Sequence, residues 1–243
     1  ATFQTVGQEN KKEGGLVEID TEGEFVRSSI ASDPGVSDFI RPYSLAILPD
    51  IDRIVSTSAD MKEADHSNVV QIWSLSNLSL IKTIVLQPGP RGNEHLDPAE
   101  PRVLGDGKTV LISTFYCGLY KIDDLESNDP TAKWVYSFDF NQKYDCAIPV
   151  VNKNYWIQAV GSKTALISLD ISNPDKPKKV DQLNFKTGEW PHWIALEPNG
   201  ERIVVTGNNR LKNTLLMVKF DKNSGTMAFD YKFRDKRSGT LGF

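Results

Sequence analysis

Residues 43–58 read Tyr-Ser-Leu-Ala-Ile-Leu, then Pro-Asp-Ile-Asp, then Arg-Ile-Val-Ser-Thr-Ser. An apolar segment, a tight polar turn and a second apolar segment together predict a β-hairpin. The pattern recurs three more times, with turns at 105–108, 152–154 and 198–200. The four turns start at 49, 105, 152 and 198, so their spacings are 56, 47 and 46 residues. Repeats of this length are typical of the blades of a β-propeller.

Each repeat continues into two more apolar segments. The third segments are expected at 69–74, 118–122, 165–169 and 214–218, and the fourth at 79–85, 132–137, 178–183 and 227–232. No stretch shows the 3.6-residue period of an amphipathic helix. The chain is therefore predicted to be all-β, a single propeller domain over 1–243 built from four-stranded antiparallel blades. Its blade-like units are 1–32, 43–86, 99–140, 146–185 and 192–235.

The first unit has only three predicted strands, at 1–5, 15–20 and 24–29. An incomplete blade would leave an unpaired sheet edge. We therefore expect about four and a half to five blades of a longer propeller whose N-terminal blades are needed to close the ring. The alternative is a complete five-bladed ring with one thin blade.

Composition narrows the classes of function. The 243 residues are 39% hydrophobic and 25% charged, with a net charge of −4 and no dense run of Lys or Arg. Nucleic acid is therefore not an expected partner. No apolar run reaches the roughly 18–20 residues that cross a bilayer, so a membrane is not expected either. The sequence does not distinguish a cytoplasmic from a periplasmic location.

The chemically interesting side chains gather on one predicted face. In an up-and-down blade, the segment leading into the first strand and the loop between the second and third strands lie on the same face. All three histidines of the chain, His66, His95 and His192, fall in or beside such segments. Loops held by a rigid frame commonly carry function, so a small-molecule substrate is expected at this face.

A metal site is the specific expectation for this face. His66, His95, Glu100 and His192 are the candidate ligands, and imidazole with carboxylate suits copper first, then zinc or iron. Asp145 and Cys146 are the candidate catalytic residues, as a base and a thiolate. The plainer alternatives are a hydrogen-bonded core histidine at 192, a solvent-exposed histidine at 66, an ion pair of Glu100 with Arg102 or Arg41, and a buried apolar role for Cys146.

Several phrases resemble bacterial propellers related to the selenium-binding protein and methanethiol oxidase family. They are Pro88–Gly92, Pro98–Val103, Ser113–Tyr120, Asp145–Pro149, Leu169–Pro174 and Pro191–Leu196, in this order along the chain. The resemblance implies a seven-bladed propeller when complete. It also implies, for some members, a copper-dependent oxidase of small thiols with histidine ligands on the axial face. Carried over by position, His66, His95, Glu100 and His192 would be those ligands.

Three functions follow. The first is a metal-binding propeller that oxidises a small thiol or other sulfur compound. The second is a non-catalytic scaffold of the WD-repeat kind, which binds a protein or ligand on the same face. The third is a calcium-dependent hydrolase or lactonase, for which Asp60, Asp65, Asp97 and Asp145 would supply oxygen ligands.

Overall fold

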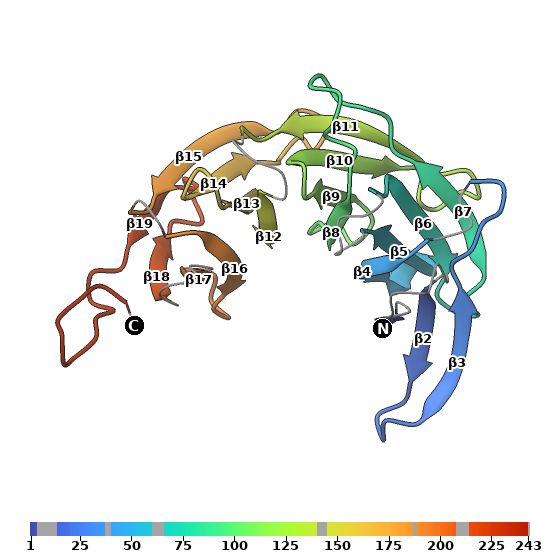
Figure 1. Ribbon diagram of the computed structural model, residues 1–243, viewed down its shortest axis with the longest axis horizontal. Coiled ribbons are helices and arrows are strands. Elements are labelled where there is room, and N and C mark those ends of the chain that lie inside the picture. The colour runs from blue at the N-terminus through green and yellow to red at the C-terminus, as the bar shows by residue number, and fades with distance from the viewer. Residues whose placement is uncertain are drawn as a thin grey trace. The chain divides into compact units, whose positions relative to one another are not determined.

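The computed structural model describes residues 1–3, 14–36, 40–59, 66–139, 145–186, 189–207 and 214–242. Figure 1 shows five antiparallel sheets, each a meander in which consecutive strands pair. The only helical element among the described residues is a short 3-10 turn, Pro49–Ile51. No described helix has the length and apolarity that crossing a bilayer requires. The predicted all-β class and repeated blade are confirmed.

The sheets follow one another along the chain. The first contains β1 (Thr2–Phe3), β2 (Gly15–Ile19) and β3 (Phe25–Ile30); the second contains β4 (Pro42–Leu48), β5 (Arg53–Ser58), β6 (Val69–Ser74) and β7 (Leu80–Val85). The third contains β8 (Pro98–Val103), β9 (Val110–Thr114), β10 (Gly118–Asp123) and β11 (Thr131–Ser137). The fourth contains β12 (Cys146–Asn152), β13 (Tyr155–Val160), β14 (Ala165–Asp170) and β15 (Lys178–Asn184). The fifth contains β16 (Pro191–Leu196), β17 (Arg202–Gly207), β18 (Leu215–Phe220) and β19 (Met227–Phe229).

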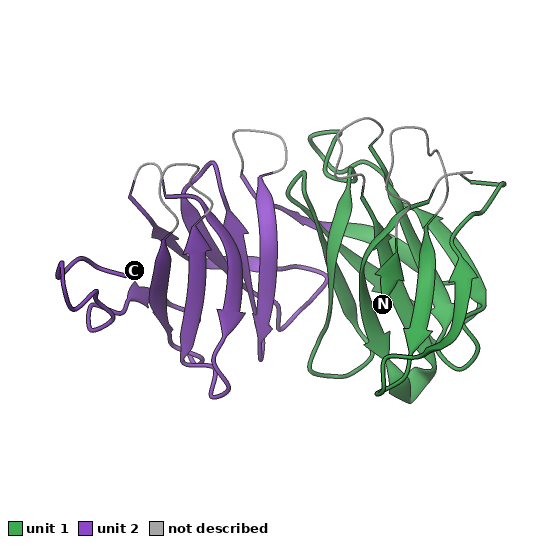
Figure 2. Ribbon diagram, turned by 60° about the horizontal axis from the view of Figure 1, so that its bottom comes forward, with its two compact units in different colours: residues 1–134 green, residues 135–243 purple. Residues whose placement is uncertain are grey.

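Two compact units divide the chain (Figure 2). Unit 1 is residues 1–134 and contains the first three sheets up to the middle of β11, and unit 2 is residues 135–243 and contains the last two. The first sheet has three strands, as the sequence predicts, and residues 4–13 of its predicted first unit lie outside the described residues.

The four predicted first turns share a backbone feature. Each contains one residue in the left-handed region: Asp52 (φ 55°), Gly107 (φ 71°), Lys153 (φ 52°) and Gly200 (φ 72°). Glycine and aspartate adopt this region readily, and a tight reversal between two antiparallel strands requires it. The Asp-, Asn- and Gly-rich sequences of these turns therefore fix where the first strand of each blade ends.

The last strand is shorter than the sequence predicts. A fourth strand is expected over 227–232, but β19 ends at Phe229. Asp230 starts a turn, because its carbonyl accepts the Phe233 N–H (2.9 Å) and its carboxylate accepts the Lys232 N–H (3.1 Å). The local Asp turn competes with the strand ladder and ends it.

Neighbouring sheets within each unit pack face to face. In unit 1, one apolar cluster joins the second and third sheets and includes Ile72, and another joins the first and second sheets and includes Trp73. These two adjacent residues point to opposite faces, and both are fully buried. In unit 2, the cluster around Ile157 and Val205 joins the fourth and fifth sheets. The second sheet is therefore covered on both faces.

A buried glutamine supports the fourth sheet. Gln158 is fully buried, accepts the Trp156 indole N–H (3.1 Å) and donates to the Ala147 carbonyl. Replacing it with leucine removes both partners, and each buried polar group left unsatisfied costs about 1–3 kcal/mol. We expect Gln158→Leu to lower the free energy of unfolding by about 3 kcal/mol, measured by urea denaturation.

The matched control is Gln182→Leu. Gln182 lies on β15 in the same cross-strand row as Gln158, through Ile167. Its side chain bonds to the surface side chains of Lys179 and Asn184. Its replacement should change stability by less than about 0.5 kcal/mol. Equal effects of the two substitutions would contradict the role given to Gln158.

Candidate functional site

A bulge lies near the start of the first strand in all four four-stranded sheets. The register shifts between Pro42 and Leu45 in β4, Pro98 and Glu100 in β8, Cys146 and Pro149 in β12, and Pro191 and Trp193 in β16. Bulges redirect side chains and are frequent beside active sites. The bulge of β16 contains His192, and that of β8 brings Glu100 opposite Ser113. In each of these four sheets, the bulge therefore places side chains outside the regular strand register at the same end of the sheet.

Asp97 occupies the position just before β8 in unit 1. Its side chain is completely buried and its backbone is left-handed, with a φ of 51°. Its carboxylate Oδ1 accepts the Ser67 N–H (3.0 Å), its own N–H donates to the Ser67 carbonyl (2.6 Å), and its carbonyl accepts the Phe115 N–H (3.0 Å). These bonds tie the end of the β5–β6 loop to the beginning of β8.

The other carboxylate oxygen of Asp97 holds His66. The distance from His66 Nδ1 to Asp97 Oδ2 is 2.8 Å. Because an ionised carboxylate only accepts hydrogen bonds, this contact favours the tautomer with the proton on Nδ1. On the far side of the ring, Nε2 lies 3.1 Å from the Tyr116 hydroxyl, which donates to it. The two contacts fix the orientation of the imidazole, and with the proton on Nδ1 the basic nitrogen is Nε2.

Tyr116 and His66 differ in their access to solvent. Tyr116 is 2% exposed, whereas the His66 side chain is 29% exposed. The two rings meet edge to face with their centroids 5.2 Å apart. Tyr116 is itself fixed because the Arg91 guanidinium donates to its carbonyl (2.9 Å). Asp97 and Tyr116, which are both buried, thus hold the partly exposed imidazole of His66 in place.

The loop before Asp97 contains two further titratable groups. Glu94 is fully buried, and its carboxylate accepts the Arg91 N–H at 2.9 and 3.1 Å. His95 Nδ1 is buried and has no hydrogen-bond partner among the described residues. Burial lowers the pKa of His95, and the nearby Glu94 carboxylate partly opposes that shift. Burial of the ring therefore disfavours its charged form.

Glu100 forms an ion pair. The Arg102 guanidinium lies 2.7 Å from its Oε2, and the Ser44 hydroxyl donates to the same oxygen at 3.2 Å. Glu100 is 7% exposed, so this is a largely desolvated ion pair. The pairing with Arg102 matches the plainer alternative drawn from the sequence, and its role as a metal ligand stays a prediction.

Unit 2 contains the other predicted site residues. The carboxylate of Asp145, just before β12, accepts bonds from the N–H and hydroxyl of Ser162. His192 is half-buried beside Trp193, with ring centroids 6.3 Å apart, and burial lowers the pKa of His192. Neither cysteine of the chain is a free thiol. Cys146 could therefore act as a thiolate only after reduction of its sulfur.

The described residues do not form a metal site by themselves. Among them, no three His, Cys, Asp or Glu side chains are grouped so as to hold a metal ion. Glu100 belongs to unit 1, and Asp145, Cys146 and His192 belong to unit 2, so their expected convergence stays a prediction. Asp60 and Asp65, proposed as calcium ligands, lie outside the described residues.

The sequence does not predict that Asp97 and Tyr116 contact His66. The sequence predicts Asp97 only as a calcium ligand and predicts no role for Tyr116. Asp97 precedes its first strand just as Asp145 precedes β12, and this repeated position was the available signal. Tyr116 is 50 residues from His66 in the chain, and no local pattern joins them.

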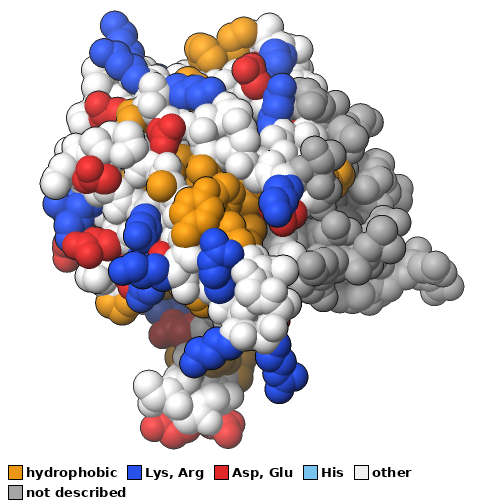
Figure 3. Space-filling view, turned by 90° about the vertical axis from the view of Figure 1, so that its left-hand side faces the viewer, with side chains coloured by type: hydrophobic (Ala, Val, Ile, Leu, Met, Phe, Trp, Pro, Cys, Tyr) orange, Lys and Arg blue, Asp and Glu red, His pale blue; other side chains and the backbone are white. Residues whose placement is uncertain are grey.

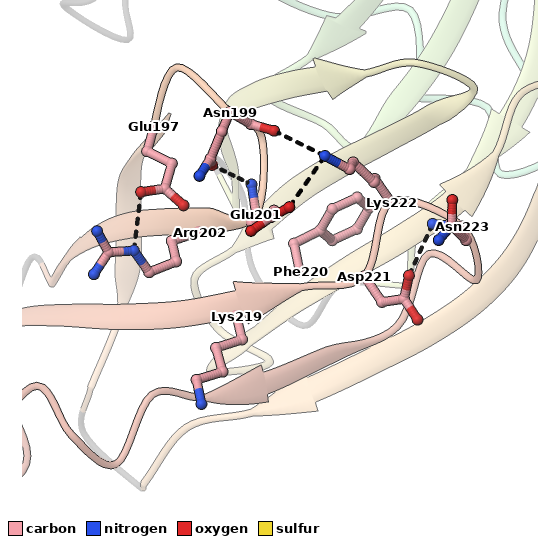
Figure 4. A pocket seen from close by; sticks show the side chains of 9 residues that line it. All are labelled: Glu197, Asn199, Glu201, Arg202, Lys219, Phe220, Asp221, Lys222 and Asn223. Atoms are coloured by element: carbon pink, nitrogen blue, oxygen red, sulfur yellow. Dashed lines mark hydrogen bonds and ion pairs between the residues drawn. The ribbon is translucent and has the colours of Figure 1, made fainter.

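The hollow on the fifth sheet carries no comparable chemistry (Figure 4). It has a volume of about 460 Å³ and lies between the β16–β17 and β18–β19 turns. Its charges neutralise each other, because Arg202 pairs with Glu197 (2.9 Å) and Lys222 with Glu201 (3.1 Å). One partner of each pair, Arg202 and Glu201, is about half exposed, so the hollow is typical of a hydrated surface.

We expect the Glu100–Arg102 pair to be structural. Arg102→Gln leaves a nearly buried carboxylate without its cation and should lower the free energy of unfolding by about 3 kcal/mol. The control Arg202→Gln breaks a more exposed pair with Glu197 and should cost less than about 1 kcal/mol. Urea denaturation of both variants compares them. An Arg102 variant as stable as the control would contradict the structural role.

The fold is shared with solved β-propellers. The chain is 15% identical to a hypothetical selenium-binding protein from Sulfolobus tokodaii, covering 94% of this chain and 62% of that one at a TM-score of 0.73. For the periplasmic gluconolactonase of Pseudomonas aeruginosa, the identity is 12%, the coverage 89% and 61%, and the TM-score 0.67. For the Cps50 (Swd1) propeller domain of Myceliophteria thermophila, the identity is 11%, the coverage is 93% of this chain and 68% of that one, and the TM-score is 0.62.

No protein-family model and no curated protein matches the chain. At these identities, the similarity to solved structures shows the fold and leaves the chemistry to the residues themselves. The chain spans less than two thirds of the length of the selenium-binding and gluconolactonase structures. It is therefore an all-β chain made of propeller blades, and it corresponds to part of the length of the propellers that it matches.

Proposed function

We propose that this propeller is a hydrolase that uses His66 as a general base on a small ester or lactone. The observation that carries the proposal is the 2.8 Å bond between His66 Nδ1 and the buried Asp97 carboxylate. A carboxylate that fixes the tautomer of a partly exposed imidazole is the arrangement of an oriented base. The gluconolactonase with the same fold supports this substrate class.

The chemistry follows from the two ring nitrogens. A water molecule that takes the place of the Tyr116 hydroxyl at Nε2 gives its proton to that nitrogen while its oxygen attacks the acyl carbon. Asp97 stabilises the imidazolium that forms. The C–O bond of the ester then breaks, and the proton passes from Nε2 to the departing alkoxide. One ester and one water give one acid and one alcohol.

Asp97 contributes by position. Its carboxylate is held by the Ser67 N–H as well as by His66, so it cannot turn away from the ring. Tyr116 contributes in the resting site by keeping Nε2 directed to one point. Asp97 is therefore a positioning residue, and His66 is the group that exchanges the proton.

A second candidate function is binding of a transition metal, copper first and then zinc or iron, with oxidation of a small thiol or sulfur compound. The unpaired, buried Nδ1 of His95 favours it, as does the carboxylate-held His66, since metal-ligating histidines commonly bond a carboxylate through the other nitrogen. The described residues fall short of a ligand set, and both His66 nitrogens have protein partners.

The test is a panel of lactones and simple esters assayed with the full-length protein and three variants. We expect His66→Ala to lower kcat by about 10²–10⁴-fold. Asp97→Asn should lower kcat with little change in KM, because the amide favours the wrong tautomer of His66. Tyr116→Phe should retain most activity. Hydrolysis at the background rate by the unmodified protein, or an unchanged kcat in His66→Ala, would contradict the proposal.

Elemental analysis of the same samples separates the two candidates. If the protein is the proposed hydrolase, its activity survives treatment with a chelator, and the purified protein needs no bound metal. Stoichiometric copper, zinc or iron that His66→Ala and His192→Ala both lose would establish the second candidate instead. Thiol oxidation would then be the activity to assay.

A further inference from the structure

The first strands of two neighbouring sheets in unit 1 carry polar side chains that the proposed hydrolysis does not use. β4 packs beside β8, and each strand has a bulge near its start. Buried Thr57 ties the two bulges together, because its hydroxyl donates to the Ala99 carbonyl (2.6 Å) and accepts the Ser44 N–H (3.3 Å). The side chains of these bulges therefore extend from a fixed backbone.

Glu100 uses only one of its two carboxylate oxygens within the protein. The Arg102 guanidinium (2.7 Å) and the Ser44 hydroxyl (3.2 Å) both donate to Oε2. Among the described residues, no group donates to Oε1, although the side chain is only 10% exposed. An ionised carboxylate accepts hydrogen bonds at both oxygens. Oε1 is therefore suited to a donor from outside the chain.

Tyr43 presents a matching group. Its ring packs edge to face against Phe115, with the centroids 5.4 Å apart, and the Phe115 N–H bonds to the Asp97 carbonyl (3.0 Å). In the described part of the chain, the Tyr43 hydroxyl has no hydrogen-bond partner. Burial and the Glu100 charge raise the pKa of Tyr43, and Arg102 partly opposes that shift. The hydroxyl therefore stays protonated at neutral pH and is able to donate.

We propose that Tyr43, Glu100 and Arg102 form a subsite for the hydroxyl groups of a neutral polyol. A hydroxyl group both donates and accepts, so it can give a hydrogen bond to Glu100 Oε1 and take one from Tyr43. The Glu100–Arg102 pair has no net charge, and the free Oε1 repels a carboxylate or phosphate. The polyol class of the substrate rests on the proposed hydrolysis, whereas the binding itself does not.

The fifth sheet provides a control surface with the same residue types. Figure 3 faces the side of Figure 1 on which β18 and β19 lie, and it shows Lys, Arg, Asp and Glu side chains interspersed there. In the Glu197–Arg202 pair, Arg202 is about half exposed, and Tyr231 is 62% exposed. Water satisfies such groups, so this surface is not expected to select a polyol. Tyr231→Phe is the matched control for Tyr43→Phe.

The test is a titration of the nitrogen-15-labelled full-length protein with methyl β-glucoside, a neutral cyclic polyol without an ester, followed by NMR chemical shifts. We expect saturable binding that Tyr43→Phe weakens by about 3- to 10-fold, the effect of one lost hydrogen bond. The melting temperature should not change, because the removed hydroxyl has no partner in the protein. Tyr231→Phe should leave the Kd unchanged. The methyl glycoside of glucuronic acid, which carries a carboxylate, should bind more weakly than methyl β-glucoside.

Three results would overturn the inference: no saturable binding of methyl β-glucoside, an unchanged Kd in Tyr43→Phe, or tighter binding of the glucuronide. The same titration of His66→Ala separates the subsite from the hydrolysis, because the probe contains no ester. Polyol binding that persists in His66→Ala, in a protein that hydrolyses no lactone, would support the subsite and contradict only the proposed hydrolase.

Discussion

A carboxylate excluded from water must be compensated by hydrogen bonds, and Asp97 is such a group. It finds its partners in the Ser67 N–H and in His66, both at the end of the loop that joins the second and third strands of the preceding sheet. The same residue immediately precedes β8. One buried charge therefore fixes the loop, the start of the strand and the tautomer of the imidazole, so that stability and candidate chemistry depend on the same bonds.

The blade repeat makes this arrangement available. Each four-stranded sheet has a bulge at the start of its first strand, and polar side chains of the second strand support the bulged backbone. Thr57 of β5 bonds to the Ser44 carbonyl, Gln158 of β13 to the Ala147 carbonyl, and Thr206 of β17 to the Trp193 carbonyl. The bulge is common to all four sheets, and three of them share this polar support.

Much of the fold could be predicted from the sequence, because strand, turn and repeat are local signals. The turn residues Asp52, Gly107 and Gly200 mark hairpins in the sequence and in the structure. The site could be predicted only in part. His66 was identified by its place in a loop, but Asp97 lies 31 residues away and Tyr116 50 residues away, so their contacts depend on packing between sheets. Glu100 pairs with Arg102, two residues along the chain, which is one of the alternatives drawn from the sequence, and its role as a metal ligand stays a prediction.

The tautomer of His66 is the most direct test of this account. Nitrogen-15 chemical shifts of the two ring nitrogens, assigned by comparison with His66→Gln, report which nitrogen carries the proton in the neutral ring. The Asp97 carboxylate requires the proton on Nδ1, leaving Nε2 as the basic nitrogen. Asp97→Asn should weaken that preference. A neutral His66 with its proton on Nε2 in the unmodified protein would contradict the proposed base and the role of Asp97.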